Sequence, residues 1–306
     1  MALLCILQLT SLATVIPGAA TWQQFQSLVC ALYYTAANET FKSDSAGHRD
    51  PLLPVNVVLQ EWCGYNVWDF AAEKMWVHKL VEAQASSTHR QIQERIYLPG
   101  NTPDIIWLDP LSTKAQVENT QEKGYTLSSD TLEKHTMSQS QLGHVAVGGT
   151  FDHLHAGHRI LLTCTAWLTR SRIVCGVMDP DSARLEKKTG YQVMESTQTR
   201  IDNVKNFLHL IRRDVVSDVV AIQDDYGPTR SDALLEAIVG SGETLRGCNM
   251  VNQVRSEGNL NALQIFIIDV ISPTAGIITM QDFQSKISST YLRMYILSHF
   301  KDAATH

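Results

Sequence analysis

The sequence has few of the features that interrupt or extend a globular fold. Only 9 of its 306 residues are proline and 17 are glycine, which excludes collagen-like and low-complexity chains. Charged residues make up 18% and apolar residues 44%, a balance that excludes wholesale disorder. The net charge of −6 excludes a generally basic nucleic-acid binder, although a mildly acidic protein can still carry one basic phosphate pocket.

Several common site motifs are also missing. No P-loop is present, because the glycine-rich stretch 240–244 lacks a Gly-Lys-Ser/Thr ending. No G-x-G-x-x-G motif follows a strand pattern, and the 6 cysteines form no C-x-x-C pair. Reduced, buried thiols are therefore expected rather than disulfides or a zinc site. We expect a cytoplasmic protein, with association with the nucleus or mitochondria left open.

The first 20 residues are apolar, but they do not have the pattern of a membrane span. They resemble the apolar part of a signal peptide, yet they lack a basic start and are interrupted by Gln8, Thr10 and Ser11. A buried strand over residues 3–9, leading through Pro17-Gly18 into a helix, fits the same residues. Both alternatives stay open, and no later stretch is long enough to span a membrane.

Length and patterning predict two domains, with residues 1–117 as a smaller α/β domain, 118–142 as a polar linker and 143–306 as the second domain. The expected elements of the first domain are strands at 3–9, 53–59 and 105–108 and helices at 22–34 and 68–81. Residues 1–140 hold 9 Lys/Arg and 14 Asp/Glu, whereas residues 141–306 hold 16 and 17. The acidity therefore lies almost entirely in the first part.

Strand and helix patterns alternate through the second domain. Strands are expected at 144–147, 172–177, 216–223, 237–239 and 264–270, and helices at 157–168, 197–211, 245–255 and 288–300. This alternation predicts an α/β fold with a Rossmann-like parallel sheet and helices on both faces. Such sheets bind ligands at the carboxyl ends of their strands.

The most informative segment lies between the first strand and the first helix of this domain. Gly148 and Gly149 let the backbone approach a ligand closely, and Thr150 adds a hydroxyl at the strand end. His155 and His158 are three residues apart at a helix start, where backbone N–H groups favour an anion. The arrangement can hold a phosphate. A metal site using His153, His155 and His158, or exposed histidines on a turn, are the alternatives.

The run Gly-Gly-Thr-Phe-Asp-His-Leu-His-Ala-Gly-His at 148–158 resembles the H-x-G-H signature of the nucleotidylyltransferase superfamily. Further motifs follow in order: Asp225-Tyr226-Gly227-Pro228-Thr229, Ser241-Gly242-Glu243-Thr244, Val251-Asn252 with Arg255, and Lys286-Ile287-Ser288-Ser289-Thr290 with Arg293. Together they resemble the eukaryotic, fungal-type stand-alone phosphopantetheine adenylyltransferases over about residues 143–296. Arg159 stands where that family often has lysine.

The resemblance implies a pantetheine-phosphate adenylyltransferase that joins ATP and 4′-phosphopantetheine to give dephospho-coenzyme A and pyrophosphate. It implies catalytic roles for His158, His155, Thr150 and the bridging lysine, with Lys188 preferred to Lys187. ATP contacts are implied for Gly148, Gly149, Phe151, Gly157, Ser288, Ser289, Thr290 and Arg293. Weaker substrate contacts are implied for Lys187, Asp225, Tyr226, Gly227, Arg246 and Arg255.

The resemblance also implies Mg²⁺ bound with ATP rather than by protein side chains, and no nucleic-acid or membrane partner. From the short stretch after Arg293 we expect a dephospho-coenzyme A kinase to be a separate protein, and other enzymes of coenzyme A synthesis are candidate partners. Two other functions stay open. One is another nucleotidylyltransferase, such as a cytidylyltransferase, and the other is a non-catalytic scaffold that contacts its partners through the acidic N-terminal domain.

Overall fold

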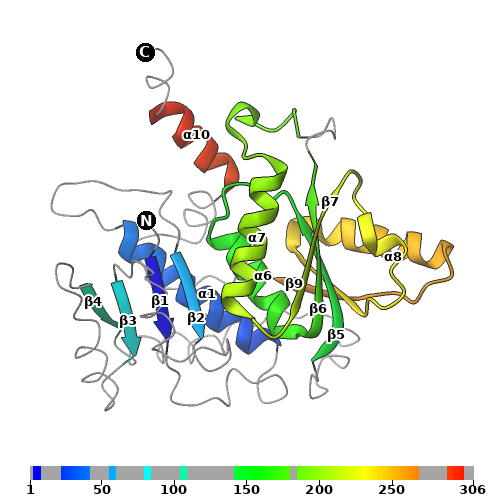
Figure 1. The fold of residues 1–306 in the computed structure, drawn as a ribbon, viewed down its shortest axis with the longest axis horizontal. Helices are drawn as coiled ribbons and strands as arrows, with labels where there is room; N and C mark the ends of the chain where they lie inside the picture. Colours follow the sequence, from blue (N-terminus) through cyan, green and yellow to red (C-terminus); the bar gives the residue numbers. More distant parts are fainter. Residues whose placement is uncertain are drawn as a thin grey trace, which may run out of the picture.

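A computed structural model shows an α/β protein built around a five-stranded parallel sheet (Figure 1). The structure describes residues 3–7, 22–41, 55–59, 79–83, 104–108, 141–179, 185–268 and 288–299. The sheet contains β5 (Leu142–Gly149), β6 (Thr169–Met178), β7 (Val216–Ile222), β8 (Ala237–Ser241) and β9 (Gln264–Ile268). Its strand order is β7-β6-β5-β8-β9, with every neighbouring pair parallel, which confirms the predicted fold class.

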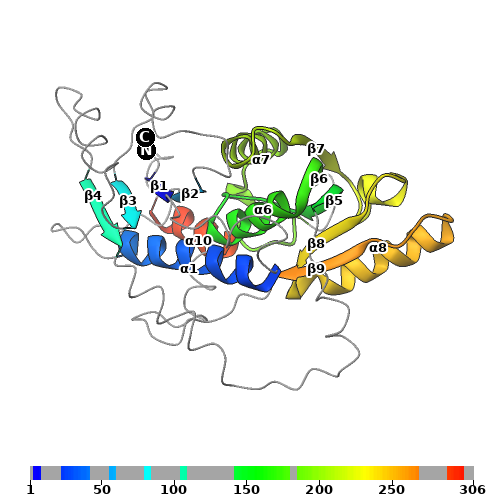
Figure 2. The ribbon, with the colours of Figure 1, turned by 90° about the horizontal axis from the view of Figure 1, so that it is seen from below.

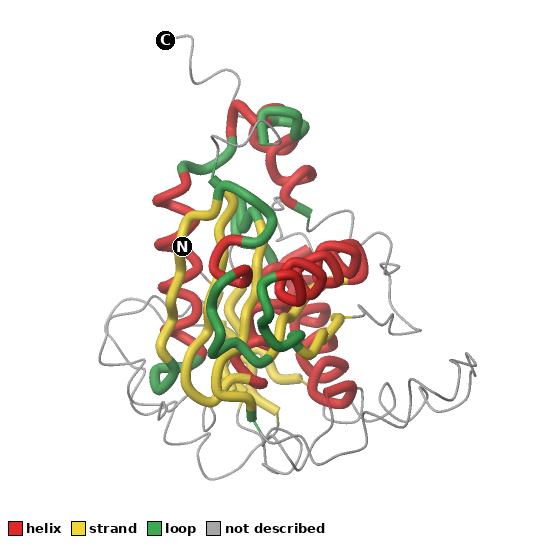
Figure 3. The backbone as a smooth tube through the Cα atoms, turned by 90° about the vertical axis from the view of Figure 1, so that its right-hand side faces the viewer, coloured by secondary structure: helices red, strands yellow, loops and turns green. Residues whose placement is uncertain are grey.

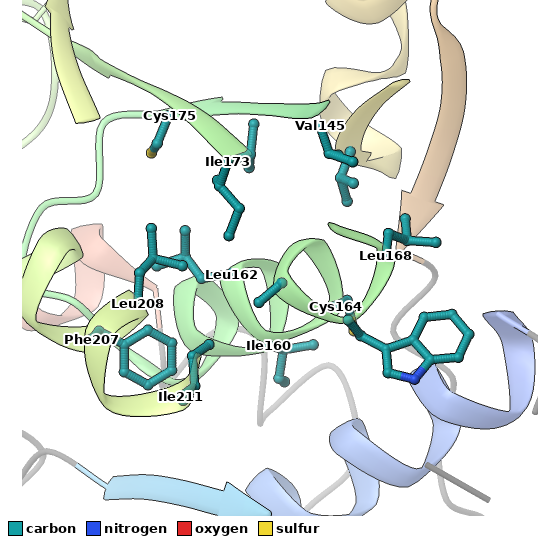
Figure 4. Packing of buried hydrophobic residues seen from close by; sticks show 14 of the residues in the cluster. Val145, Ile160, Leu162, Cys164, Leu168, Ile173, Cys175, Phe207, Leu208 and Ile211 are labelled. Atoms are coloured by element: carbon teal, nitrogen blue, oxygen red, sulfur yellow. The ribbon is translucent and has the colours of Figure 1, made fainter. Parts of the chain in front are cut away.

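The helices of this sheet lie on its two faces. α6 (Ala156–Leu168) and α7 (Thr197–Ile211) share one core with β5 and β6, whereas α8 (Leu245–Glu257) contributes to a smaller core on the other face (Figures 1 and 3). Figure 4 shows Leu162 of α6 and Leu208 of α7 in the larger core with Ile173 of β6. α10 (Ser289–His299) and the 3-10 helices η3 (Tyr191–Val193), η4 (Gly227–Arg230) and η5 (Gly242–Thr244) complete this part.

The chain reverses its direction of winding at β5. The path from β5 through α6, β6 and α7 leads outward to β7, and the chain then returns to place β8 on the other side of β5. The carboxyl ends of β5 and β8 lie next to each other at this switch point. Residues 148–150 lie at the end of β5, and residues 241–242 lie at the end of β8. Ligands of open α/β sheets bind at such a point, so the fold places the predicted motif where a site is expected.

The N-terminal part contains four described strands in two parallel pairs. β1 (Leu3–Leu7) pairs with β2 (Val55–Leu59), and β3 (Lys79–Ala83) pairs with β4 (Asp104–Leu108). Strands were expected near the positions of β1, β2 and β4. The prediction of a helix at 68–81 is wrong for residues 79–81. These residues belong to β3, which is hydrogen-bonded to β4. The predicted linker lies outside the described residues, apart from its last two, and the two-domain division stays a prediction.

Helix α1 (Trp22–Phe41) packs against the second part of the chain (Figure 2). Phe25 is fully buried and stacks on Trp167 of α6 with ring centroids 4.6 Å apart and an interplanar angle of 10°. Trp22 meets Phe266 of β9 edge-on at 5.3 Å, and its indole donates to the carbonyl of Ile267. This cover helps to explain why nine of the 13 residues of α6 are buried, where the sequence predicted a single apolar face.

Two further expectations concern thiols and membranes. Cys30, Cys164, Cys175 and Cys248 are free and buried, as predicted for them, and burial raises the pKa of each thiol. Among the helices that the structure describes, none combines the length and the apolar character needed for a membrane crossing.

Candidate active site

The loop between β5 and α6 has an unusual backbone conformation. Phe151 and His153 have φ values of 51° and 45°, a region that residues other than glycine rarely occupy. Glu195, which lies just before α7, stabilises this conformation with two hydrogen bonds. Its Oε2 accepts the His153 N–H at 2.8 Å, and its own N–H donates to Asp152 Oδ1 at 2.9 Å. Arg200 of α7 donates to the Thr150 carbonyl at 2.7 Å. The loop is therefore fixed by residues from the α7 side of the fold.

His155 and His158 lie face to face at the start of α6. His155 is the N-cap residue, and the two rings stack with centroids 3.8 Å apart and an interplanar angle of 25°. Phe151 is fully buried and its ring lies 5.2 Å from that of His158. Each histidine is partly exposed, yet the Nδ1 atom of each is buried and has no hydrogen-bond partner among the residues that the structure describes. Two buried polar atoms at a helix N-terminus fit a polar or anionic ligand.

Both imidazoles are held in the neutral form. Burial, followed by the charge of Arg159, lowers the pKa of His155 from 6.5 to about 3. Burial also lowers the pKa of His158 well below 6.5, with further contributions from His155, Arg159 and Lys188. A neutral imidazole donates one hydrogen bond without a net charge, so at neutral pH this pair can offer N–H groups to phosphate oxygens.

The structure distinguishes between the two adjacent lysines. Both side chains are exposed, and a hydrogen bond joins Lys188 to the site: its Nζ donates to Thr150 Oγ1 at 2.8 Å. Burial lowers the pKa of Lys188 below 10.5, as do Arg293 and Arg200, and Asp152 opposes this effect. An ammonium group, a hydroxyl group and two imidazoles thus come together at the carboxyl end of β5.

The start of α10 closes the site on another side. Ser289 Oγ donates to the Asp152 carbonyl at 2.9 Å, and Ser288 Oγ accepts the Tyr291 N–H at 3.2 Å as a cap. Arg293, one turn later, donates to Thr290 Oγ1 at 3.1 Å and to Asp152 Oδ2 at 2.7 Å. The predicted motif at 288–293 is therefore in direct contact with the loop that carries the histidines.

Comparisons with known proteins identify the family of this chain. The family model described as cytidylyltransferase-like matches residues 146–295. A protein named phosphopantetheine adenylyltransferase from Pyrobaculum aerophilum is 35% identical over 150 residues, which cover 49% of this chain and 89% of that relative. The chain belongs to the cytidylyltransferase-like family.

Other relatives of this cytidylyltransferase-like chain match different shares of it. An uncharacterized protein of Schizosaccharomyces pombe is 29% identical over 272 residues, 89% of this chain and 79% of that protein. A phosphopantetheine adenylyltransferase of Saccharomyces cerevisiae is 32% identical over 160 residues, 52% of this chain and 50% of that protein. The match therefore spans half the length of the yeast enzyme.

Three of the weaker site candidates form a turn after β7. Asp224, which the sequence did not single out, accepts the backbone N–H groups of Tyr226 and Gly227 at 2.9 and 2.7 Å. These bonds, the Gly227 N–H first, lower the pKa of Asp224. Gly227 has a φ of 43°, and a Cβ there would lie 2.4 Å from Ile222 Cγ2. The local geometry of Asp225, Tyr226 and Gly227 is thus explained by the turn itself.

The two weaker arginine candidates occupy opposite ends of α8. Arg246 lies exposed in its first turn, near the carboxyl end of β8. Arg255 is fully buried in the last turn and donates to the carbonyls of Thr229, Asp232 and Asn261 at 2.7–2.9 Å. Because α8 runs antiparallel to β8, Arg255 lies at the amino ends of the strands. The structure does not bring it to the histidines.

Asp152, His153 and Glu195 place one ligand-type atom each within 4.8 Å of one another. Each is already engaged: Asp152 by Glu195 N and Arg293, and Glu195 by His153 N and by Asn203 Nδ2. His153 Nε2 lies 2.9 Å from the Val193 carbonyl oxygen. These hydrogen bonds account for the cluster as a support of the turn.

Sequence reasoning missed Asp152, Glu195 and Arg200 as supports of the site. Arg200 is fully buried and donates to the carbonyls of Thr150, Met178 and Glu195. The local signal for this role was a pair of opposite charges around the start of α7. Glu195 lies just before the helix and Arg200 lies in its first turn. The partners of these side chains lie 43 and 50 positions away, so spacing alone did not reveal them.

Proposed function

We propose that this chain transfers the adenylyl group of ATP to 4′-phosphopantetheine, giving dephospho-coenzyme A and pyrophosphate. The nucleotidyltransferase class follows from the family. The choice of substrates is supported by the printed names of the relatives from P. aerophilum, S. cerevisiae and Methanothermobacter thermautotrophicus, which are 32–35% identical over about half of this chain.

The observation that carries the proposal is the pair of neutral histidines beside Lys188 and Thr150. Within the described part of the chain, the buried Nδ1 atoms of His155 and His158 have no hydrogen-bond partner, and the Lys188 ammonium lies against the Thr150 hydroxyl. Phosphoryl and nucleotidyl transfer needs such donors placed where negative charge develops. It needs no covalent nucleophile from the protein, and the proposal assigns none.

In the proposed step, a phosphate oxygen of 4′-phosphopantetheine attacks the α-phosphorus of ATP. A new O–P bond forms as the bond between the α-phosphorus and the bridging oxygen breaks, and the electron pair leaves with pyrophosphate. His158 and His155 donate to the ATP phosphate oxygens, and Thr150 orients the attacking phosphate. Lys188 bridges the two reacting groups, so its positive charge offsets the charge that accumulates between them.

The remaining contacts in the proposal concern nucleotide binding. Gly148, Gly149 and Gly157 let the phosphates approach the backbone, and the N–H groups at the start of α10 (288–290) hold the β- and γ-phosphates. Mg²⁺ would arrive with ATP, bound mainly through phosphate oxygens and water, where it would neutralise phosphate charge. The Asp152–His153–Glu195 cluster fits this poorly as a protein-side metal site, because its ligand-type atoms are used in hydrogen bonds.

A cytidylyltransferase is the second candidate, because the family model that matches this chain is described as cytidylyltransferase-like. The two candidates differ in the nucleotide and in the acceptor. A cytidylyltransferase would release pyrophosphate from CTP in the presence of a phosphorylated alcohol.

The test measures pyrophosphate release by the full chain with ATP or CTP, each with and without 4′-phosphopantetheine. We expect release only with ATP and 4′-phosphopantetheine together, and a loss of about 100-fold or more in kcat for His158→Ala. Lys205→Ala, at an exposed position on α7, is the matched control and should keep the wild-type rate. Release that is independent of 4′-phosphopantetheine would sink the proposal, and full activity of His158→Ala would refute the role of that residue.

A further inference from the structure

Three segments that are distant in the sequence form a closed ring of contacts beside the histidines. Lys188 Nζ donates to Thr150 Oγ1 at 2.8 Å, which joins the loop before η3 to the end of β5. Arg293 Nη1 donates to Asp152 Oδ2 at 2.7 Å, which joins α10 to the loop after β5. Arg293 Nε donates to the Thr189 carbonyl at 2.7 Å, which joins α10 to the residue after Lys188. The guanidinium therefore contacts both segments that Lys188 connects.

We infer that Arg293 is a positioning residue that holds Lys188 against Thr150. The sequence had suggested instead that Arg293 clamps the ATP phosphates. The inference rests on the proposed function, since the role of Lys188 as the bridging cation is part of it. What it adds is the residue that sets the place of that cation.

The surroundings of Arg293 favour positioning over direct phosphate binding. Its side chain is only 2% exposed, and each of its three guanidinium nitrogens already donates to a protein oxygen: Thr189 O, Asp152 Oδ2 and Thr290 Oγ1. The Asp152 carboxylate is fully buried and also accepts the Glu195 N–H. Turning the guanidinium toward a phosphate would take its charge away from the Asp152 carboxylate, which is buried.

The electrostatics point the same way. Lys188 faces Arg293 of α10, Arg200 of α7 and His158 of α6. The negative charge that acts on Lys188 comes from Asp152, in the loop after β5. Arg293 therefore disfavours the ammonium form of Lys188. A second cation at this place does not help Lys188 to stay charged, so its benefit to Lys188 is geometric.

Gly190 provides a way to disturb this arrangement without removing a charge. Its φ is 76°, and a Cβ there would lie 2.8 Å from Arg293 Cβ, closer than real Cβ atoms approach. A side chain at 190 must push the Lys188 loop away from α10. Gly247 of α8, where a Cβ would meet nothing within 4 Å, provides the matched control.

The first test is a double-mutant cycle on kcat with Lys188→Ala, Arg293→Lys and both together. Arg293→Lys keeps the positive charge but loses the fork that spans Asp152 and Thr189. We expect Arg293→Lys alone to lower kcat by about 100-fold, and the double variant to be no slower than Lys188→Ala. Effects that multiply would mean that Arg293 acts on substrate independently of Lys188, and would overturn the inference.

The second test uses Gly190→Ala and Gly247→Ala. We expect Gly190→Ala to lower kcat while the KM for ATP changes little, and Gly247→Ala to match the wild type. A phosphate clamp predicts the opposite split for Arg293→Lys, with a raised KM for ATP. Thermal unfolding establishes that each variant is folded. If Arg293→Lys does not fold, Gly190→Ala still tests whether Arg293 positions Lys188.

The third test does not depend on turnover, so it separates a failure of this inference from a failure of the proposed function. Acylation of lysines is followed by mass spectrometry across pH, with Lys187 in the same peptide region as an internal control for the reagent. We expect the midpoint for Lys188 to lie below 10.5 in the wild type and to rise in both Gly190→Ala and Arg293→Lys, because the ammonium group of Lys188 then lies farther from the positive charge at position 293. An unchanged midpoint in Gly190→Ala would refute positioning, whatever reaction the chain catalyses.

Discussion

The rings of His155 and His158 stack at 3.8 Å although each can carry a positive charge. Two imidazolium groups at this separation would repel each other strongly in a buried site. Burial and the nearby cation Arg159 oppose protonation of both rings, so the stack is a feature of the neutral pair. The pair is thereby prepared as two hydrogen-bond donors rather than as a general acid.

This finding predicts how the histidines titrate. The pKa of His155 is lowered from 6.5 to about 3, so His155 should stay neutral as the pH falls from 8 to 5. NMR of the ring carbon-bound protons should show no transition for His155 in that range, whereas the urea-unfolded chain should titrate near 6.5. A midpoint at or above 6 in the folded protein would contradict the burial argument.

The basic limb of the pH–rate profile should report Lys188. Its pKa is lowered below 10.5, so raising the pH removes the bridging charge, and kcat/KM should fall as the pH passes through the lowered value. Lys188→Arg keeps a cation whose pKa is above 12, so this limb should move to higher pH in that variant. Lys205→Arg, on the exposed face of α7, should leave the profile unchanged. An identical limb in Lys188→Arg would assign the titration to another group.

The packing of α1 predicts that the N-terminal helix contributes to the stability of the catalytic part. Phe25 is fully buried against Trp167, so Phe25→Ala should lower the free energy of unfolding by about 3–5 kcal/mol. Chemical denaturation followed by tryptophan fluorescence measures this change. Gln23→Ala, exposed on the same helix, should stay within about 0.5 kcal/mol of the wild type. Equal stability of both variants would mean that α1 is not part of the shared core.

Arg200 should be needed for stability and for activity. Arg200→Met leaves the carbonyls of Thr150, Met178 and Glu195 without this donor, and should cost about 3 kcal/mol in the free energy of unfolding. Because Thr150 and the turn at 151–153 lose their support, pyrophosphate release should fall as well. The comparison is Lys205→Met, which changes an exposed cation on the same helix. A folded Arg200→Met variant with wild-type stability would show that water replaces the guanidinium.

The sequence was informative wherever a structural feature depends on neighbours within a few residues. The apolar periodicity from residue 143 onward predicted the helices and strands of the sheet, because side chains facing one core repeat every 3.6 residues in a helix. The spacing of His155 and His158 placed them on one face of α6, as the stacked rings confirm. Periodicity failed at 79–81, where pairing with β4 determines a strand.

Contacts between distant segments were decided by the tertiary structure alone. Spacing could not choose between Lys187 and Lys188, whereas the packed loop directs only Lys188 to Thr150. Arg293 and Asp152 are 141 positions apart, and Phe25 and Trp167 are 142 apart, so no local pattern links them. The sequence by itself determined the α/β sheet, the histidine-containing motif at 153–158 and the family of the chain. Tertiary packing decided which polar groups face that motif and which form buried pairs with each other. A buried charge is tolerated only where the fold supplies its partner.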